Sequence, residues 1–151
     1  MATAEKKAIL FVDDEPSVLS CLRRLMRKEN RNLLFAQSGM EGLGILKNQE
    51  VDVVVSDMRM PQMDGATFLK QVLEFYPGTI RIMLTGYADR ASVTQAFAAA
   101  DIYEVVSKPW DDDKLKQLLR DALEHSNDHE HARPDLHKII NEIDPLPPDY
   151  L

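Results

Sequence analysis

Five side chains that could carry out chemistry together lie at the ends of short apolar segments: Asp13, Asp14, Asp57, Thr85 and Lys108. Three carboxylates that converge in a small volume repel one another, which raises at least one pKa unless a cation intervenes. Lys108 supplies one positive charge, and a divalent metal is the natural source of the rest. Oxygen ligands without His or Cys favour Mg²⁺ or Mn²⁺ over zinc. A carboxylate beside such a metal, an ammonium group and a hydroxyl can accept a phosphoryl group, whose charge the cations neutralise.

Short apolar segments alternate with helical patterns five times along most of the chain. The predicted strands are 8–12, 33–36, 51–55, 80–84 and 103–106, and the predicted helices lie near 16–29, 39–48, 65–75, 89–100 and 112–125. This alternation predicts an α/β fold with a parallel sheet and helices on both faces. Five strands favour the flavodoxin-like order 2-1-3-4-5, a three-layer α/β/α sandwich. Ligands of such sheets bind at the carboxyl ends of the strands, so we expect the five side chains to meet there.

Each candidate residue also has an ordinary structural explanation. The acidic pair 13–14 could cap the next helix and face its dipole. Asp57 could be a loop carboxylate, Thr85 could simply end a strand, and Lys108 could be a solvated lysine before a turn. Asp64 is expected to cap a helix rather than to bind metal. The combination at the ends of four predicted strands favours a shared site over these separate explanations.

Four motifs resemble those of the receiver domains of two-component response regulators. In order they are FVDDE (11–15), SDMRMPQMDG (56–65), LTGY (84–87) and SKPW (107–110). One such motif alone would be weak evidence, but four in order at the ends of four predicted strands form a specific signal. The resemblance spans residues 7–125. It implies a phosphoacceptor that assists its own phosphorylation and dephosphorylation, and not an enzyme with a separate substrate.

The resemblance implies how the carboxylates are used. Asp57 would accept a phosphoryl group from the phosphohistidine of a sensor histidine kinase or a phosphotransfer protein. Asp13 and Asp14 would hold Mg²⁺ (or Mn²⁺), with Asp57 and the backbone carbonyl of Arg59 as the remaining protein ligands. Phosphorylation would then bias a two-state equilibrium that controls the binding of a partner or an output module.

The resemblance also implies roles for the residues around these carboxylates. Thr85 would bond the phosphoryl group, and Lys108 would pair with it. The bond between Lys108 and Pro109 would be cis, which proline tolerates. Gly65 would permit the turn after the third strand.

The position of the aromatic switch departs from the family pattern. Many receivers carry an aromatic switch residue three positions before the lysine, and that position is Val105 here. Tyr103 lies two residues further back, so we expect its side chain to face the same side of the strand as Val105. Either Tyr103 or Tyr87 could replace the usual aromatic switch.

Composition excludes several classes of protein. The chain has 151 residues, of which 44% are hydrophobic, and a net charge of -7. No apolar run approaches the ~18–20 residues of a membrane-spanning helix, and the first residues lack the apolar stretch of a secretion signal. The single cysteine, Cys21, cannot form an internal disulfide. We therefore expect a cytoplasmic protein that binds neither membranes nor, by itself, nucleic acid.

The composition changes near residue 125. Residues 125–151 contain six acidic and two basic residues, four prolines and all four histidines. We therefore predict a receiver domain over 1–125 and an acidic, Pro- and His-containing tail or linker over 126–151. The tail contains a short amphipathic helical pattern with an apolar stripe, formed by Leu136, Ile139, Ile140 and Ile143.

The sequence leaves alternatives for the output. The chain could be a fragment of a larger regulator with a cyclic-di-GMP phosphodiesterase or kinase module, or it could form a homodimer through the face of helix four, strand five and helix five. A function of another class is an aspartate-nucleophile phosphatase of the haloacid dehalogenase type. Such a phosphatase needs a second acid two residues after the nucleophile, and Arg59 stands there.

Overall fold

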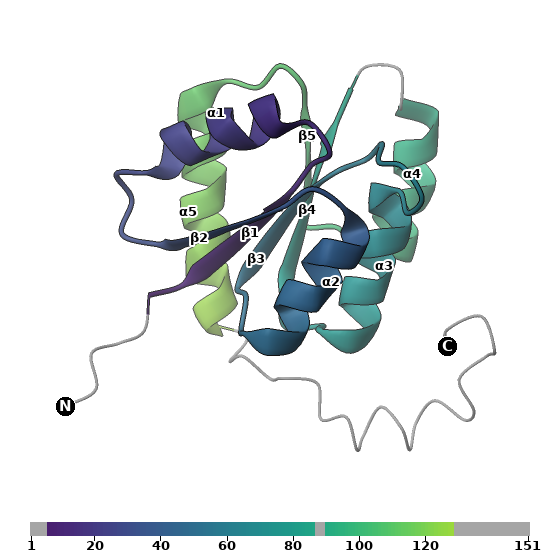
Figure 1. Ribbon diagram of the computed structural model, residues 1–151, viewed down its shortest axis with the longest axis horizontal. Helices are drawn as coiled ribbons and strands as arrows, with labels where there is room; N and C mark the ends of the chain where they lie inside the picture. Colours follow the sequence, from purple (N-terminus) through teal and green to yellow (C-terminus); the bar gives the residue numbers. More distant parts are fainter. Residues whose placement is uncertain (1–5, 87–89, 129–151) are drawn as a thin grey trace.

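The computed structural model describes residues 6–86 and 90–128, and these form a three-layer α/β/α sandwich (Figure 1). The central sheet is parallel, with the strand order β2-β1-β3-β4-β5 that the sequence predicts. Its strands are β1 (Ala8–Val12), β2 (Asn32–Ala36), β3 (Val53–Asp57), β4 (Ile80–Thr85) and β5 (Glu104–Ser107). The helices are α1 (Pro16–Met26), α2 (Gly39–Asn48), α3 (Gly65–Phe75), α4 (Arg90–Ala99) and α5 (Asp112–Asp128).

The three inner strands are buried along their whole length because helices cover both faces of the sheet. Helices α1 and α5 lie on one face, and α2, α3 and α4 lie on the other (Figure 1). Phe11, Leu22 and Leu119 belong to the core under α1 and α5, whereas Val54 and Phe68 belong to the opposite core. Burial on both faces explains why these strands read as continuous apolar runs in the sequence.

Short polar side chains fix where several helices begin. Ser38 accepts a hydrogen bond from the backbone amide of Glu41 at 3.0 Å, and Asp64 accepts one from that of Thr67 at 2.8 Å. These bonds satisfy amides that have no partner inside the helix. The prediction that Asp64 caps a helix is therefore confirmed.

Some boundaries differ from the prediction. Strand β3 begins at Val53 and not at residue 51, because its pairing with β1 begins there, with Val53 opposite Ile9. Just before the strand, the Asp52 carboxylate accepts a hydrogen bond from the backbone amide of Ala8 at 2.7 Å. Helix α5 continues to Asp128, three residues past the predicted end, so polar composition alone did not mark its end. The division of the chain at residue 125 remains a prediction, and the amphipathic pattern beyond residue 134 lies outside the described residues.

The prediction that Tyr103 and Val105 face the same side is wrong. Val105 packs against the core under α2, α3 and α4, whereas Tyr103 packs against the opposite core. The Tyr103 ring centroid lies 5.6 Å from that of His125. Tyr103 precedes the first residue of β5, so the alternation of side chains within a strand does not apply to it. Tyr103 therefore does not occupy the side of the missing aromatic switch, and Tyr87 lies outside the described residues.

A buried arginine ties β4 to the end of α4. Arg81 is 7% exposed, and its guanidinium donates to the backbone carbonyls of Ala100 and Asp101 at 2.9 and 3.2 Å. It also donates to the carbonyls of Pro77 and Thr79. Burial lowers the pKa of Arg81, an effect that Asp101 opposes. The predicted strand 80–84 contained this residue, but nothing in the sequence indicated that a charged side chain would find carbonyl partners in the interior.

We expect Arg81→Met to lower the free energy of unfolding by about 2–3 kcal/mol, because it leaves buried carbonyls without donors. Chemical denaturation of the purified chain measures this. Lys70→Met, on an exposed position of α3, is the matched control and should change stability by less than about 0.5 kcal/mol. Equal effects of the two substitutions would contradict the role given to Arg81.

No helix in the described part of the chain is both long enough and apolar enough to cross a membrane.

Candidate phosphoryl-transfer site

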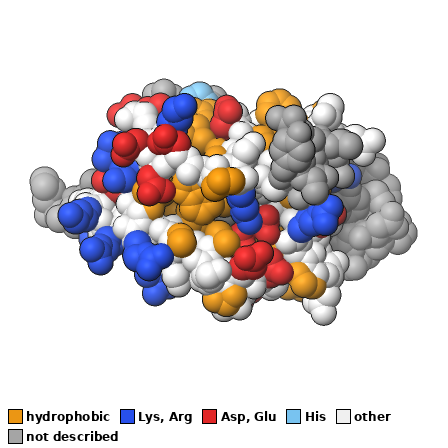
Figure 2. All heavy atoms as spheres, turned by 90° about the horizontal axis from the view of Figure 1, so that it is seen from above, with side chains coloured by type: hydrophobic (Ala, Val, Ile, Leu, Met, Phe, Trp, Pro, Cys, Tyr) orange, Lys and Arg blue, Asp and Glu red, His pale blue; other side chains and the backbone are white. Residues whose placement is uncertain are grey.

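The three predicted carboxylates meet at the carboxyl ends of β1 and β3. One side-chain oxygen from each of Asp13, Asp14 and Asp57 lies within 4.8 Å of the other two. Asp13 and Asp57 are 0% and 6% exposed, and Asp14 is half-buried. The face at the strand ends shows a group of acidic side chains next to basic ones (Figure 2). Asp13 and Asp57 are therefore recessed, whereas Asp14 is partly exposed to solvent.

Lys108 reaches the cluster from the loop after β5. Its Nζ lies 3.0 Å from Asp13 Oδ2 and 3.0 Å from Asp57 Oδ1, so one ammonium group bridges carboxylates from two strands. The backbone amide of Lys108 donates to the carbonyl of Thr85 at 2.8 Å, which fixes the start of the loop. The Lys108–Pro109 peptide bond is cis, as the resemblance implies.

The turn after β3 holds Asp57 in place. The amide of Met58 donates to the carbonyl of Leu84 at 3.0 Å, and the amide of Gly65 donates to the carbonyl of Met58 at 2.7 Å. A Cβ on Gly65 would lie only 2.0 Å from the backbone oxygen of Asp57. The close approach of these two backbones therefore requires glycine at position 65. On the neighbouring strand, the amide of Glu15 donates to Asp13 Oδ1 at 2.9 Å and orients that carboxylate.

Thr85 and Arg59 are the two remaining candidate residues of the site. Leu84 pairs with Asp57 in the sheet, so Thr85 stands one residue further toward the carboxyl edge, and it is buried. The Thr85 hydroxyl donates to the carbonyl of Gly86 at 3.2 Å. The Arg59 side chain is exposed. Binding of metal by the Arg59 carbonyl and of a phosphoryl group by Thr85 remain predictions.

A family model for the response regulator receiver domain matches residues 9–120. The chain belongs to the receiver family. The transcriptional regulatory protein GlrR of Escherichia coli K12 is 38% identical over 120 residues, which are 78% of this chain and 26% of that protein. The hydrogenase transcriptional regulatory protein HoxA of Cupriavidus necator is 35% identical over 141 residues, 93% of this chain and 28% of that protein.

A solved structure supports the same assignment. The signal receiver domain of an HD domain-containing protein from Pseudomonas fluorescens Pf-5 is 40% identical, with a TM-score of 0.79, and the match covers 82% of this chain and 99% of that one. This receiver spans about a quarter of the length of the curated relatives GlrR and HoxA. What those whole regulators do is therefore a separate matter from what this receiver does.

The negative charges of the receiver site outnumber its positive charge. Burial raises the pKa of Asp57, and the negative charge of Asp13 adds to this, while the hydrogen bond from Lys108 opposes it. Burial lowers the pKa of Lys108, but its hydrogen bonds to Asp13 and Asp57 outweigh this effect. The pKa of Lys108 is therefore raised overall. Lys108 therefore stays charged at neutral pH, and one positive charge faces three carboxylates.

The residues present fit a hard divalent cation. The donor set is all oxygen, it comes from three carboxylates, and it has a charge deficit that one ammonium group does not cover. Receiver domains bind Mg²⁺ in an acidic pocket of this kind. Asp13, Asp14 and Asp57 are the residues that would hold the ion here.

The raised pKa of Asp57 predicts how stability changes with pH in metal-free protein. A protonated Asp57 stabilises the folded state fully below the unfolded pKa near 3.8, and this contribution is lost as pH rises through the raised folded pKa. At pH 7 we therefore expect Asp57→Asn to melt a few degrees above the wild type, with the difference shrinking as the pH falls toward 4.

Thermal melts in a chelator at several pH values measure this difference. Excess Mg²⁺ should raise the melting temperature, because the ion binds only the folded state. The rise should be larger for the wild type, because Asp57→Asn removes one of the three carboxylates that would hold the ion. Identical melting temperatures at every pH would contradict the burial penalty assigned to Asp57.

Proposed function

We propose that this receiver accepts a phosphoryl group on Asp57 from a phosphohistidine of a sensor histidine kinase or a phosphotransfer protein. The observation that carries the proposal is the bridge from Lys108 to both Asp13 and Asp57, with the Asp14 carboxylate alongside. An ordinary helix cap or a solvated lysine does not require such convergence. The family match supports the same function.

The reaction is a displacement at phosphorus. A carboxylate oxygen of Asp57 forms a bond to phosphorus as the bond between phosphorus and the imidazole nitrogen breaks. The imidazole leaves with the electron pair and takes up a proton, and the product is an aspartyl phosphate. Lys108 lies 3.0 Å from Asp57 and can pair with the transferred oxygens, and Thr85 at the end of β4 can donate a hydrogen bond to one of them. When bound, Mg²⁺ supplies charge neutralisation of the phosphoryl oxygens.

We further propose that the receiver controls an output outside the described residues. The curated relatives are transcriptional regulators, and the Pseudomonas receiver comes from an HD domain-containing protein. A regulator with a cyclic-di-GMP phosphodiesterase or kinase output therefore remains our alternative to a transcriptional one. The face of α4, β5 and α5 is the surface at which we propose that a partner or a second copy binds.

Phosphorylation by a small acyl phosphate tests the function without knowledge of the kinase. We expect the chain to gain one phosphoryl group by intact-protein mass spectrometry in the presence of Mg²⁺ and none in the presence of a chelator. Beryllofluoride with Mg²⁺ should shift the NMR signals of residues at the ends of β1, β3 and β4. Absence of both effects in correctly folded protein would overturn the proposal.

Lys108→Ala should slow phosphorylation by about 100-fold, because the ammonium group that pairs with the transferred oxygens is lost. The initial rate with the same acyl phosphate and saturating Mg²⁺ measures this. Lys114→Ala, an exposed lysine at the start of α5, is the matched control and should keep the wild-type rate. A Lys108→Ala rate close to that of the control would exclude the role given to this lysine.

A further inference from the structure

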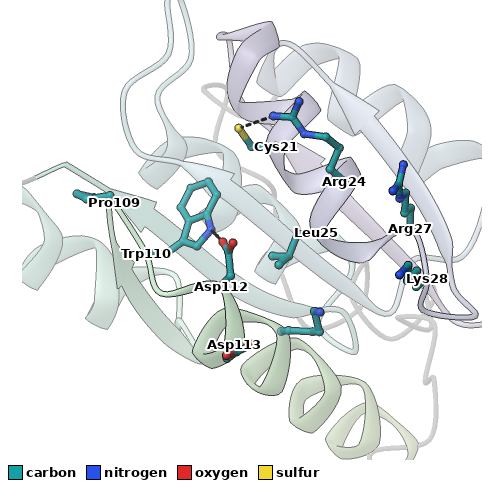
Figure 3. Close-up of a pocket in the computed structure, with 10 residues that line it drawn as sticks. Cys21, Arg24, Leu25, Arg27, Lys28, Pro109, Trp110, Asp112 and Asp113 are labelled. Carbon is teal, nitrogen blue, oxygen red and sulfur yellow. Dashed lines mark hydrogen bonds between the residues drawn. The ribbon is translucent and has the colours of Figure 1, made fainter.

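A groove separates the C-terminal half of α1 from the start of α5 (Figure 3). Its volume is about 710 Å³. Leu25 points from α1 into the space between the helices, and Trp110 lies on the opposite side, where its indole N–H donates to Asp112 at 3.0 Å. Both are only half-buried. The groove therefore offers an apolar surface that the described part of the chain leaves uncovered.

The rim of the groove is basic although the whole chain is acidic. Four basic residues line it, against the two acidic residues Asp112 and Asp113; the basic ones are Arg24, Arg27, Lys28 and Lys116. The chain as a whole has a net charge of -7. An occupant with an apolar side and acidic flanks would complement this groove.

The C-terminal residues of the same chain combine an apolar stripe with acidic side chains. Residues 129–151 contain five acidic and two basic residues. Within them, Leu136, Ile139, Ile140 and Ile143 recur at the spacing of one helix face, next to Glu142 and Asp144. So small an apolar stripe cannot form a core alone and needs another surface to cover it.

The residues between the end of α5 and the apolar stripe are numerous enough to span the distance to the groove. Lys116 lies about 18 Å from Asp128 along α5, at 1.5 Å per residue. The eight residues from Asp128 to Leu136 span up to about 26 Å when extended. The stripe can therefore reach back along α5 to the groove without any change in the described structure.

We propose that residues 134–144 dock in the groove between α1 and α5 of the same chain, with the apolar stripe on Leu25 and Trp110 and the acidic residues near the basic rim. The groove starts at Pro109, next to Lys108, so the docked segment lies beside the loop that carries the site lysine. The groove lies outside the carboxylate cluster, so docking does not require the proposed phosphoryl transfer.

The chain provides two probes of the groove, since Cys21 and Trp110 are its only cysteine and its only tryptophan and both line it. In the full chain, Ile139→Asp/Ile140→Asp should raise the alkylation rate of Cys21 severalfold and move the Trp110 indole signal in ¹⁵N–¹H spectra. Glu142→Lys/Asp144→Lys should act in the same direction.

Glu130→Lys/Asp149→Lys is the matched control, because it makes the same charge change outside residues 134–144 and should leave both probes at their wild-type values. Unchanged probes in the Ile139→Asp/Ile140→Asp variant would overturn the proposal. An alkylation rate that rises on dilution of the wild type would also overturn it, because the occupant would then be a second copy or another molecule. A rate independent of concentration supports docking within one chain.

Discussion

Asp57→Asn is expected to abolish uptake of a phosphoryl group from an acyl phosphate, because the amide cannot act as the nucleophile. The amide has nearly the shape of the carboxylate, and the neutral form of Asp57 is the one that burial favours, so the variant should fold at least as well as the wild type. Loss of phosphorylation would thus report on chemistry and not on unfolding. Intact-protein mass spectrometry under Mg²⁺ measures the loss.

Asp64→Asn is the matched control for this experiment. Asp64 caps α3 through the amide of Thr67, and asparagine caps helices about as well as aspartate. Asp64→Asn should therefore keep the wild-type rate and extent of phosphorylation. If Asp57→Asn still gained a phosphoryl group, another residue would be the acceptor and the proposed mechanism would fail.

Gly65→Ala is expected to lower the free energy of unfolding by at least about 3 kcal/mol, a shift of more than a hundredfold in the folding equilibrium. The added Cβ would stand 2.0 Å from the backbone oxygen of Asp57 and 2.9 Å from the Cα of Met58. Both contacts are with backbone, which cannot move aside as the end of a flexible side chain can. Relief of the clash must displace the turn that carries Asp57, so phosphorylation should slow as well.

Gly44→Ala separates this clash from the general effect of removing a glycine. Gly44 lies within α2, and a Cβ there would meet nothing within 4 Å. We expect Gly44→Ala to stabilise the protein by about 0.5–1 kcal/mol, because alanine restricts the unfolded chain and favours helix. Equilibrium denaturation of both variants measures the difference. If Gly65→Ala left the free energy of unfolding unchanged, or raised it as Gly44→Ala is expected to, the close approach at Gly65 would be refuted.

Pattern and position in the sequence were sufficient to predict the sheet and the edge at which the carboxylates meet. Strands buried on both faces read as apolar runs, as Val53–Val55 does, and helices between them enforce a parallel order. A polar residue directly after such a run must lie at the carboxyl edge. The sequence therefore predicts that Asp13 and Asp57 are neighbours, and β1 and β3 are indeed paired.

Other features depend on which segments lie against each other in space. The direction of Tyr103 follows from where β5 begins, and the carbonyl partners of Arg81 come from the end of α4 and a loop. The bridge from Lys108 to two carboxylates and the basic groove beside Trp110 likewise join residues far apart in the chain. The sequence alone determined the order of elements and the edge of the site, because periodicity and strand ends are local properties. Only the tertiary structure decided which side chains contact one another, because that depends on how the helices pack on the sheet and on the course of the loops.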